Sequence, residues 1–367
     1  MNTTRRMARL MGMVIALAIV TAACGDSSDI GSENSSGNQS SDSTTPKEAP
    51  INATLNASGA TFPKAFYEVA IASYKQVQSG VTVNYNAVGS GAGRQNLQDG
   101  VVDFAGSDGL VADADKAKYK GEFLYVPTIA APITVSYNLS GVTDLQLDAD
   151  TIAKIFQRQI TMWDDPAIAA LNSGVRLPST DIAVARRSDG SGTTENFTKY
   201  LVAAAPNTWT LRSGSTVEWP ASTQAGAGNT GVAQIVKSTA GAVGYVDLSD
   251  AKASGLQFAK IRNKAGKAVP PTLDAASSAL AGAQINADLT YNPLNADGDA
   301  SYPITAPTWV LVYKNQTDKP KGEAIKSFLK YMLTDGQKLA KDVDFAALPA
   351  AVAQQALAQV ENIIVPA

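Results

Sequence analysis

The 367-residue chain contains no histidine and a single cysteine. Without histidine, a catalytic triad that relies on an imidazole base is excluded, and so is a histidine metal site, which makes most hydrolase mechanisms hard to build. One cysteine allows no disulfide within the chain. No segment ends in the Gly-Lys-Ser or Gly-Lys-Thr of the phosphate-binding loop of nucleotidases, so that class is excluded as well.

The apolar run near the N-terminus, residues 10–20, is too short to span a bilayer stably, because a spanning helix needs about 20 apolar residues. Three arginines precede this run, and the small residues Thr21, Ala22 and Ala23 follow it. This order is typical of a secretory signal peptide. We therefore expect residues 1–23 to be removed on export; a short membrane anchor helix is the alternative.

Cys24 directly follows the expected cleavage site. Its position resembles the lipobox of bacterial lipoproteins, in which the thiol is acylated, although Thr21 stands where that pattern prefers a bulky aliphatic residue. We expect Cys24 to be the lipidation site; an unmodified, buried cysteine is the alternative. Residues 25–52 are mostly polar and cannot bury enough apolar surface to offset the entropy of ordering. The lipidated cysteine and a disordered tether are therefore predicted to take residues 24–52.

The chain as a whole has a net charge of −3. Residues 1–23 hold three arginines and no acid, so the mature chain would have a net charge near −6. Such acidity does not favour nucleic acid or anionic lipid as a partner. The remaining residues, about 315, are enough for two ordinary domains or one large one.

Strands and helices are predicted to alternate along these residues. Residues 81–87 alternate apolar and polar side chains with the period of a strand, and residues 63–78 place apolar side chains on one helical face. Asp148 or Asp150 is expected to cap a later helix. This alternation predicts α/β layers with largely parallel sheets. Further strands are predicted at residues 101–104, 133–137, 181–187, 241–246 and 309–313, and further helices after residues 93, 150 and 193 and around 325–332.

Three turns rich in glycine and hydroxyl residues, 59–63, 89–93 and 189–193, lie at the starts of predicted helices. A helix N-terminus exposes unpaired N–H groups and the positive end of a dipole, so each turn is a potential anion site. Ordinary capping by Ser and Thr is the alternative for any one turn. Three such turns in one chain favour a shared function.

The second of these turns also imitates a dinucleotide-binding fingerprint, because a strand precedes Gly89 and Gly91 and an acid, Asp108, follows about 20 residues later. That fingerprint needs a third glycine where this chain has Arg94. An exported protein would also rarely meet such a cofactor. We therefore expect no cofactor, and no metal.

Four segments can be compared with known proteins. They are 59–63 (Gly-Ala-Thr-Phe-Pro), 88–93 (Val-Gly-Ser-Gly-Ala-Gly), 102–108 (Val-Asp-Phe-Ala-Gly-Ser-Asp) and 186–193 (Arg-Arg-Ser-Asp-Gly-Ser-Gly-Thr). They resemble the ligand-binding segments of one family, the phosphate-binding proteins of bacterial phosphate-specific ABC transporters. The resemblance extends in the family's order from about residue 55 to 350, and it includes 163–172, 241–246 and 348–349.

The resemblance implies a two-lobed α/β fold of the periplasmic-binding-protein type, each lobe a largely parallel sheet flanked by helices, with the ligand in the cleft between the lobes. The first lobe would take residues 53–128 plus 303–367, and the second residues 129–302. The implied function is capture of inorganic phosphate outside the cell and its delivery to the membrane permease subunits of an ABC importer. Such a protein is not an enzyme, and it would be lipid-anchored to the outer face of the cytoplasmic membrane.

The resemblance also implies which residues hold phosphate. Arg187 would pair with the oxygens of the anion, and Asp189 would orient Arg187. Asp108 would accept a hydrogen bond from the ligand, while the other ligands would supply backbone amides and hydroxyls. The implied phosphate ligands are Ala60, Thr61, Phe62, Ser90, Asp108, Arg187, Ser191, Gly192 and Thr193.

Asp108 is the one carboxylate among these ligands, and its chemistry points to selectivity. A carboxylate repels a fully deprotonated oxyanion but accepts a hydrogen bond from a protonated phosphate oxygen. Sulfate has no proton to give at neutral pH, so Asp108 should reject it. The alternative for Asp108 is a solvated loop acid. Two other functions stay open: a secreted phosphatase, for which we find no nucleophile with a base, and a surface receptor with an adhesive or signalling role.

Overall fold

The computed structural model describes residues 49–367. The predicted signal peptide, Cys24 and most of the predicted tether therefore lie outside the described residues. The last residues assigned to the tether are described, and they contact Gln78, which accepts a hydrogen bond from the amide of Ile51 (3.2 Å) and donates one to the carbonyl of Ala49 (3.2 Å). Within residues 49–367, no helix has the length and apolar character needed to cross a membrane.

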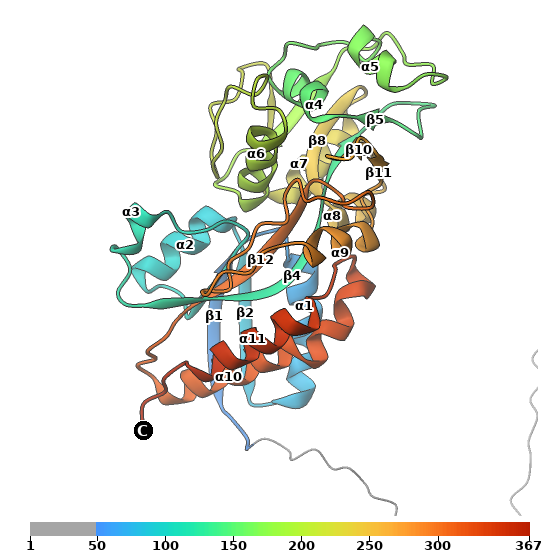
Figure 1. Ribbon diagram of the computed structural model, residues 1–367. Coiled ribbons are helices and arrows are strands. Elements are labelled where there is room, and N and C mark those ends of the chain that lie inside the picture. The colour runs from blue at the N-terminus through green and yellow to red at the C-terminus, as the bar shows by residue number, and fades with distance from the viewer. Residues whose placement is uncertain (1–48) are drawn as a thin grey trace, which may run out of the picture. The chain divides into compact units, whose positions relative to one another are not determined.

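One large sheet runs through the described residues in the order β2-β1-β3-β12-β4-β8-β6-β7, with β9 also paired to β4. Its central strand is β4 (Phe123–Tyr137). The first part of β4 pairs with β12 (Thr305–Tyr313), and the second part pairs with β8 (Ala242–Asp247). β4 therefore joins two lobes, which are drawn one above the other in Figure 1.

The first lobe contains β2, β1 and β3, which pair in parallel, together with β12 and the start of β4. Figure 1 shows α1, α10 and α11 on one side of these strands and α2 on the other. Phe66, Ala70 and Tyr74 of the helix predicted at residues 63–78 are buried, whereas Val77, expected on the same face, is exposed. The elements of this lobe, besides β12 and β4, are β1 (Ala53–Gly59), α1 (Lys64–Val77), β2 (Val81–Ala87), α2 (Ser90–Asp99), β3 (Phe104–Ser107), α3 (Asp113–Lys116), α10 (Lys319–Leu333), the 3₁₀ helix η1 (Asp335–Val343) and α11 (Ala350–Glu361).

The second lobe contains β7, β6 and β8, which pair in parallel, together with the end of β4. Asp148, one of the two candidate caps, caps α4, since its carboxylate accepts a hydrogen bond from the amide of Thr151 (2.8 Å). A small sheet of order β11-β10-β5 was not predicted. The elements of this lobe, besides β8 and β4, are β5 (Gln146–Leu147), α4 (Ala149–Phe156), α5 (Pro166–Leu171), β6 (Ala183–Arg187), α6 (Gly192–Ala204), β7 (Gln224–Gly226), α7 (Gly228–Ser238), α8 (Leu248–Ala253), β9 (Gln257–Phe258), β10 (Lys260–Arg262), β11 (Ala268–Val269) and α9 (Leu273–Ala281).

Three expectations about the strands need correction. The outer strands pair in parallel as predicted, but β4 and β12 run antiparallel to their neighbours, so the sheet is mixed. The strand predicted at 101–104 begins only at Phe104, because residues 101–103 form a bend. The strand predicted at 133–137 is the last third of β4. The rest of β4 was not predicted because it contains Pro127 and Pro132. Proline cannot donate a hydrogen bond to the sheet, so it usually argues against a central strand. Here both prolines are nevertheless paired with β12.

Candidate functional site

The predicted site residues lie where parallel strands of the two lobes end. Thr61 follows β1, Ser90 follows β2 and Asp108 follows β3. In the second lobe, the segment from Ser188 to Thr193 follows β6. Ligands of open α/β sheets bind beyond the carboxyl ends of the strands. The topology therefore brings all four predicted turns and loops to one place.

Short contacts between the lobes show that these loops meet. The amide of Gly91 donates to the carbonyl of Gly190 (2.9 Å), and the side-chain amide of Asn196 donates to the carbonyl of Asp108 (2.6 Å). A Cβ at Gly192 would lie 2.5 Å from Ser90 Oγ and 2.7 Å from Asp108. Such distances cannot be accommodated, so the close approach of the two lobes requires glycine at this position.

Asp108 is buried, with 2% of its surface exposed, which contradicts the alternative of a solvated loop acid. The hydroxyl of Thr308 donates to its Oδ1 (2.7 Å), and the hydroxyl of Ser90 lies 3.3 Å from its Oδ2. Burial raises the pKa of Asp108 to about 7, although the hydrogen bond from Thr308 and the charge of Arg187 act to lower it. Asp108 therefore takes up or releases a proton near neutral pH.

Arg187 is the cation of the site, and its side chain is buried. Its Nε donates to Asp189 Oδ1 (2.8 Å), and its Nη2 pairs with Asp189 Oδ2, so Asp189 lies where the orienting role requires it. Nη1 of the same guanidinium lies 3.5 Å from Thr193 Oγ1. Burial acts to raise the pKa of Asp189, but the hydrogen bond and charge of Arg187 outweigh it, and the pKa is lowered. Asp189 is therefore ionised at neutral pH.

Ser191 and Ala60, two further predicted ligands, differ in which of their groups are still free to bind a ligand. Ser191 caps α6 by accepting a hydrogen bond from the amide of Thr194 (3.1 Å), which leaves its own hydroxyl hydrogen available. Ala60 has both backbone groups engaged, because its amide donates to Gly106 (2.9 Å) and its carbonyl accepts from the hydroxyl of Tyr85 (2.8 Å). Ala60 therefore shapes the turn, whereas the serine and threonine hydroxyls are suited to donate to a ligand.

Sequence comparison agrees with this geometry. A family model described as a PBP superfamily domain matches residues 44–336. The chain is 36% identical over 310 residues to the phosphate-binding protein PstS of Pasteurella multocida, an alignment that covers 82% of this chain and 88% of the relative. It is 34% identical over 357 residues to the phosphate-binding protein PstS 3 of Mycobacterium tuberculosis, covering 94% of this chain and 95% of the relative. The chain belongs to the PstS family of phosphate-binding proteins.

Solved structures confirm the fold expected for a PstS-family chain. A high-affinity periplasmic phosphate-binding protein, PfluDING, solved with bound phosphate, superposes with a TM-score of 0.70 at 21% identity, covering 83% of this chain and 93% of that one. A human phosphate binding apolipoprotein superposes with a TM-score of 0.68 at 19% identity, with the same two coverages. The two-lobed α/β fold of the periplasmic-binding type is therefore confirmed.

Four residues near the site were not predicted from the sequence. Thr308 comes from β12, far along the chain from the glycine turns, and nothing in the sequence links it to Asp108. Arg94 of α2 pairs with Glu195 of α6 across the lobes (3.4 Å) and donates to Ser107 Oγ (3.0 Å). Asn229, near the start of α7, contacts two of the predicted threonines. It follows Gly226 and Gly228 at the start of a helix, which is the same pattern as in the three predicted turns and could have identified it from the sequence.

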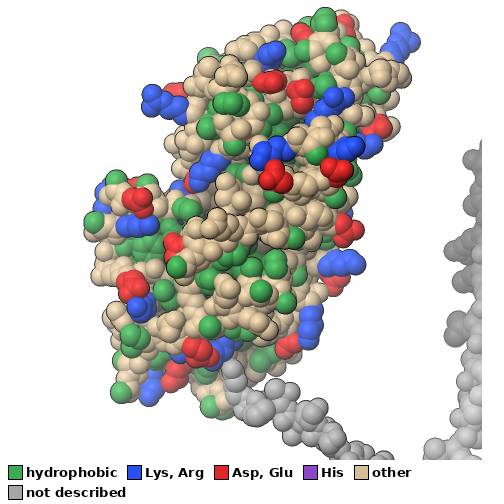
Figure 2. Space-filling view, viewed as in Figure 1, with side chains coloured by type: hydrophobic (Ala, Val, Ile, Leu, Met, Phe, Trp, Pro, Cys, Tyr) green, Lys and Arg blue, Asp and Glu red, His purple; other side chains and the backbone are tan. Residues whose placement is uncertain are grey.

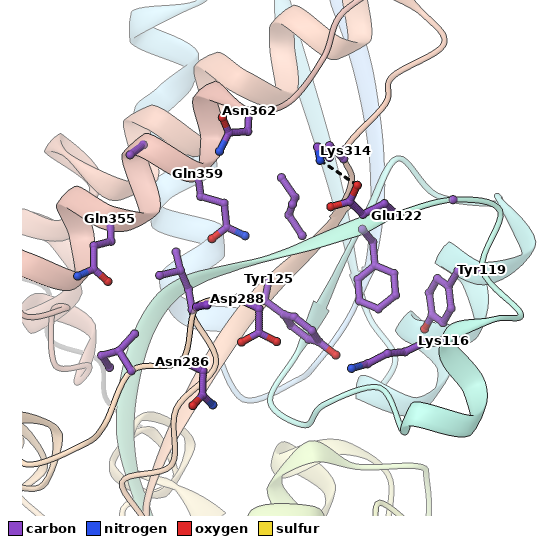
Figure 3. A pocket seen from close by; sticks show the side chains of 17 residues that line it. Lys116, Tyr119, Glu122, Tyr125, Asn286, Asp288, Lys314, Gln355, Gln359 and Asn362 are labelled. Atoms are coloured by element: carbon purple, nitrogen blue, oxygen red, sulfur yellow. Dashed lines mark hydrogen bonds and ion pairs between the residues drawn. The ribbon is translucent and has the colours of Figure 1, made fainter.

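A separate cavity lies elsewhere in this PstS-family structure. It has a volume of about 1060 Å³ and is lined by the start of β4 and the loop before it, by residues 285–289, by Lys314, which follows β12, and by α11. Figure 3 shows Gln355 and Gln359 of α11 and Tyr125 of β4 among the side chains that line it, and Lys314 paired with Glu122 (2.8 Å). Its charges are of both signs, and it has no buried guanidinium. Its volume therefore does not make it the better candidate for an anion.

The charged side chains on the surface are mixed in sign. Figure 2 shows acidic and basic groups interspersed over the face drawn, without an extended patch of either. Among residues 49–367, no group of three or more acidic or cysteine side chains is placed to hold a metal ion. The concentration of buried polar groups around Asp108 and Arg187 therefore remains the candidate site.

Proposed function

We propose that the chain binds inorganic phosphate between its two lobes and delivers it to the membrane permease subunits of a phosphate ABC importer. The observation that carries this proposal is the buried set of polar groups drawn from both lobes. It consists of one guanidinium, Arg187, with its partner Asp189, several hydroxyls and a second carboxyl, Asp108. A tetrahedral anion offers many acceptor lone pairs, which match a site made mostly of donors.

The proposed phosphate ligands are those that the resemblance implied, except Ala60, whose amide and carbonyl are both engaged within the first lobe. Thr61, Phe62 and Ser90 would donate from the first lobe, with Ala60 holding the first turn in shape. Asp108 would accept the proton of a protonated phosphate oxygen. The ligands proposed from the second lobe are Arg187, Ser191, Gly192 and Thr193, with Asp189 orienting Arg187.

The proposal also includes the location of the protein. A signal peptide at residues 1–23, lipidation at Cys24 and a tether to residue 52 would hold the binding domain at the outer face of the cytoplasmic membrane. The lobes proposed are 53–128 plus 303–367 and 129–302. Pairing within the sheet supports these boundaries. Residue 128 lies inside β4, and further along that strand the pairing partner of β4 changes from β12 to β8. Residue 303 lies just before β12.

The proposed function is tested by calorimetric titration of the purified mature protein with phosphate, arsenate and sulfate. We expect a dissociation constant for phosphate of about 1 μM within a factor of ten, which corresponds to roughly −8 kcal/mol. Sulfate should bind far more weakly. A protein that binds none of these anions would refute the proposal. Because the family consists of binding proteins of transporters, not enzymes, a chromogenic phosphate ester should release no product.

A further inference from the structure

Asn229, near the N-terminus of α7, connects two of the proposed phosphate ligands. It is fully buried, and its side-chain Nδ2 donates to Thr61 Oγ1 (3.2 Å) and to Thr193 Oγ1 (3.1 Å). Its backbone amide also donates to Thr61 Oγ1 (3.3 Å). Thr61 follows β1 of the first lobe and Thr193 lies in α6 of the second, so one side chain reaches across the site.

The backbone that carries Asn229 is fixed by groups of the same site. Gly228 has a φ of 67°, which favours glycine, and its amide donates to Asp189 Oδ1 (3.1 Å). Asp189 is also the carboxylate that binds Arg187. The start of α7 is therefore tied to the arginine through Asp189 and to the threonines through Asn229. A displacement of this helix end would disturb both parts of the site.

The hydrogen-bond capacity of a hydroxyl decides what these contacts do. A threonine hydroxyl has one hydrogen to donate and two lone pairs to accept with. Thr61 Oγ1 accepts from both nitrogens of Asn229, and Thr193 Oγ1 accepts from Asn229 and faces Arg187 Nη1 at 3.5 Å. With the lone pairs occupied, the hydrogen of each hydroxyl must point away from Asn229 and Arg187.

We propose that Asn229 is a positioning residue that forces the hydroxyls of Thr61 and Thr193 to act as donors toward the bound anion. This rests on the proposed function, because it assigns a role within the phosphate site. A second observation points the same way. The Oδ1 of Asn229 is buried and has no hydrogen-bond partner within residues 49–367. A packing residue would not be expected to leave such an acceptor unpaired, so the side chain is held for its donors.

The test compares substitutions that keep the shape of Asn229 but change its hydrogen bonding. Asn229→Asp replaces the donor by an acceptor, so both threonine hydroxyls would turn toward the new carboxylate and away from the anion. We expect phosphate affinity to fall by about 100-fold or more, since a like charge is added as well. Asn229→Ala removes the donor without adding charge and should cost about tenfold. Asn172→Ala is the matched control, because Asn172 is also buried and its side-chain hydrogen bonds go to Gln146 and Ile168, which are not part of the site. It should lower the unfolding temperature and leave phosphate affinity unchanged.

A double-mutant cycle separates positioning from a structural role. In a protein carrying Thr61→Val and Thr193→Val, no hydroxyl remains to be oriented, so Asn229→Ala should change the phosphate dissociation constant by less than about twofold. If Asn229→Ala still lowered phosphate affinity about tenfold in that background, the proposal would be overturned. An Asn229→Asp protein with wild-type phosphate affinity would overturn it as well. Circular dichroism and thermal unfolding would show that each variant is folded. If the wild-type protein itself bound no phosphate, the proposed function would fail instead, and the cycle would not be measured.

Discussion

Asp108→Asn should stabilise the phosphate-free protein at alkaline pH while making it less selective. The folded protein raises the pKa of Asp108 from 3.8 to about 7 by burial. Below pH 3.8 the carboxyl is protonated in both the folded and the unfolded state, so it makes no difference to stability. Between the two pKa values the folded state keeps a proton that the unfolded state has lost, so the free energy of unfolding falls as pH rises.

The size of the effect follows from the shift. About three pH units correspond to about 4 kcal/mol of unfolding free energy, which is fully lost above pH 7. Asparagine is neutral and similar in shape, and its amide oxygen can still accept the hydrogen bond from Thr308. Urea unfolding at pH 4, 6 and 8, without phosphate, should therefore show Asp108→Asn close to wild type at pH 4 and several kcal/mol more stable at pH 8. Asp247, whose pKa burial also raises, titrates in both proteins; the charge of Asp108 is only the smallest cause of that rise, so most of the Asp247 contribution cancels in the comparison. Equal pH slopes for the two proteins would refute the reasoning.

Asp108→Asn should raise stability at alkaline pH but lower the selectivity for phosphate over sulfate. At pH 8 the ionised Asp108 offers sulfate only an acceptor, whereas the amide of Asp108→Asn can donate to it, so the gap between phosphate and sulfate affinity should narrow. As pH falls below 7, Asp108 itself becomes protonated and able to donate, and wild-type sulfate affinity should rise. Sulfate keeps its charge over this range, so calorimetry with sulfate reports the state of the protein. Sulfate affinity that is independent of pH in wild type, or unchanged by Asp108→Asn, would remove Asp108 from the selectivity mechanism.

Three further predictions follow from the site and the N-terminus. Arg187→Ala removes the only cation proposed to bind the anion and should cost about 2–5 kcal/mol, or roughly 30-fold or more in phosphate affinity. It should also weaken the phosphate-induced compaction measured by small-angle scattering. An Arg187→Ala protein that binds phosphate and compacts like wild type would show that the ligand lies elsewhere. Arg94→Gln breaks the partly buried ion pair with Glu195 that joins the lobes and should lower phosphate affinity about fivefold, or about 1 kcal/mol. Lys314→Gln, which breaks an ion pair within the first lobe, is its control, and equal effects of the two changes on affinity would argue against a role of Arg94 in closure. Cys24→Ala should yield protein without lipid, either released or left uncleaved, and a wild-type protein that incorporates no labelled fatty acid would disprove the anchor.

The sequence predicted the parts of the fold and site that local patterns encode. The alternation at residues 81–87 matches β2 residue for residue, and Ser90 and Asp108, which come from two different predicted segments, are in hydrogen-bonding contact. The centre of the sheet was harder, because β4 and β12 are apolar on both faces and lack alternation, and Pro127 disguises β4 further. A buried strand of this kind is defined by its neighbours and not by its own pattern.

The residues that support the ligands were harder still to predict. Thr308 and Glu195 act on Asp108 and Arg94 from elements distant in the sequence, and only the folded sheet brings them together. In the sequence, Arg94 is informative only as the residue that breaks a dinucleotide fingerprint. In the structure it donates to Ser107, next to Asp108, and pairs with the opposite lobe. Such roles depend on spatial neighbours, for which a single sequence carries no signal.

Because the charged side chains of the site nearly cancel one another, neutral groups must supply most of the binding free energy. Asp189 binds Nε and Nη2 of the Arg187 guanidinium, so the net charge of this pair is zero, and Asp108 adds negative charge whenever it is ionised. A phosphate dianion therefore enters a site without a surplus of positive side-chain charge. Its oxygens must be stabilised by dipoles instead: hydroxyls, backbone amides and the N-termini of α2, α6 and α7. Dipoles act only at contact distance and only when correctly oriented. Affinity should for that reason depend on closure of the lobes, which brings the donors into contact, and on residues such as Asn229 that fix the direction of each O–H bond.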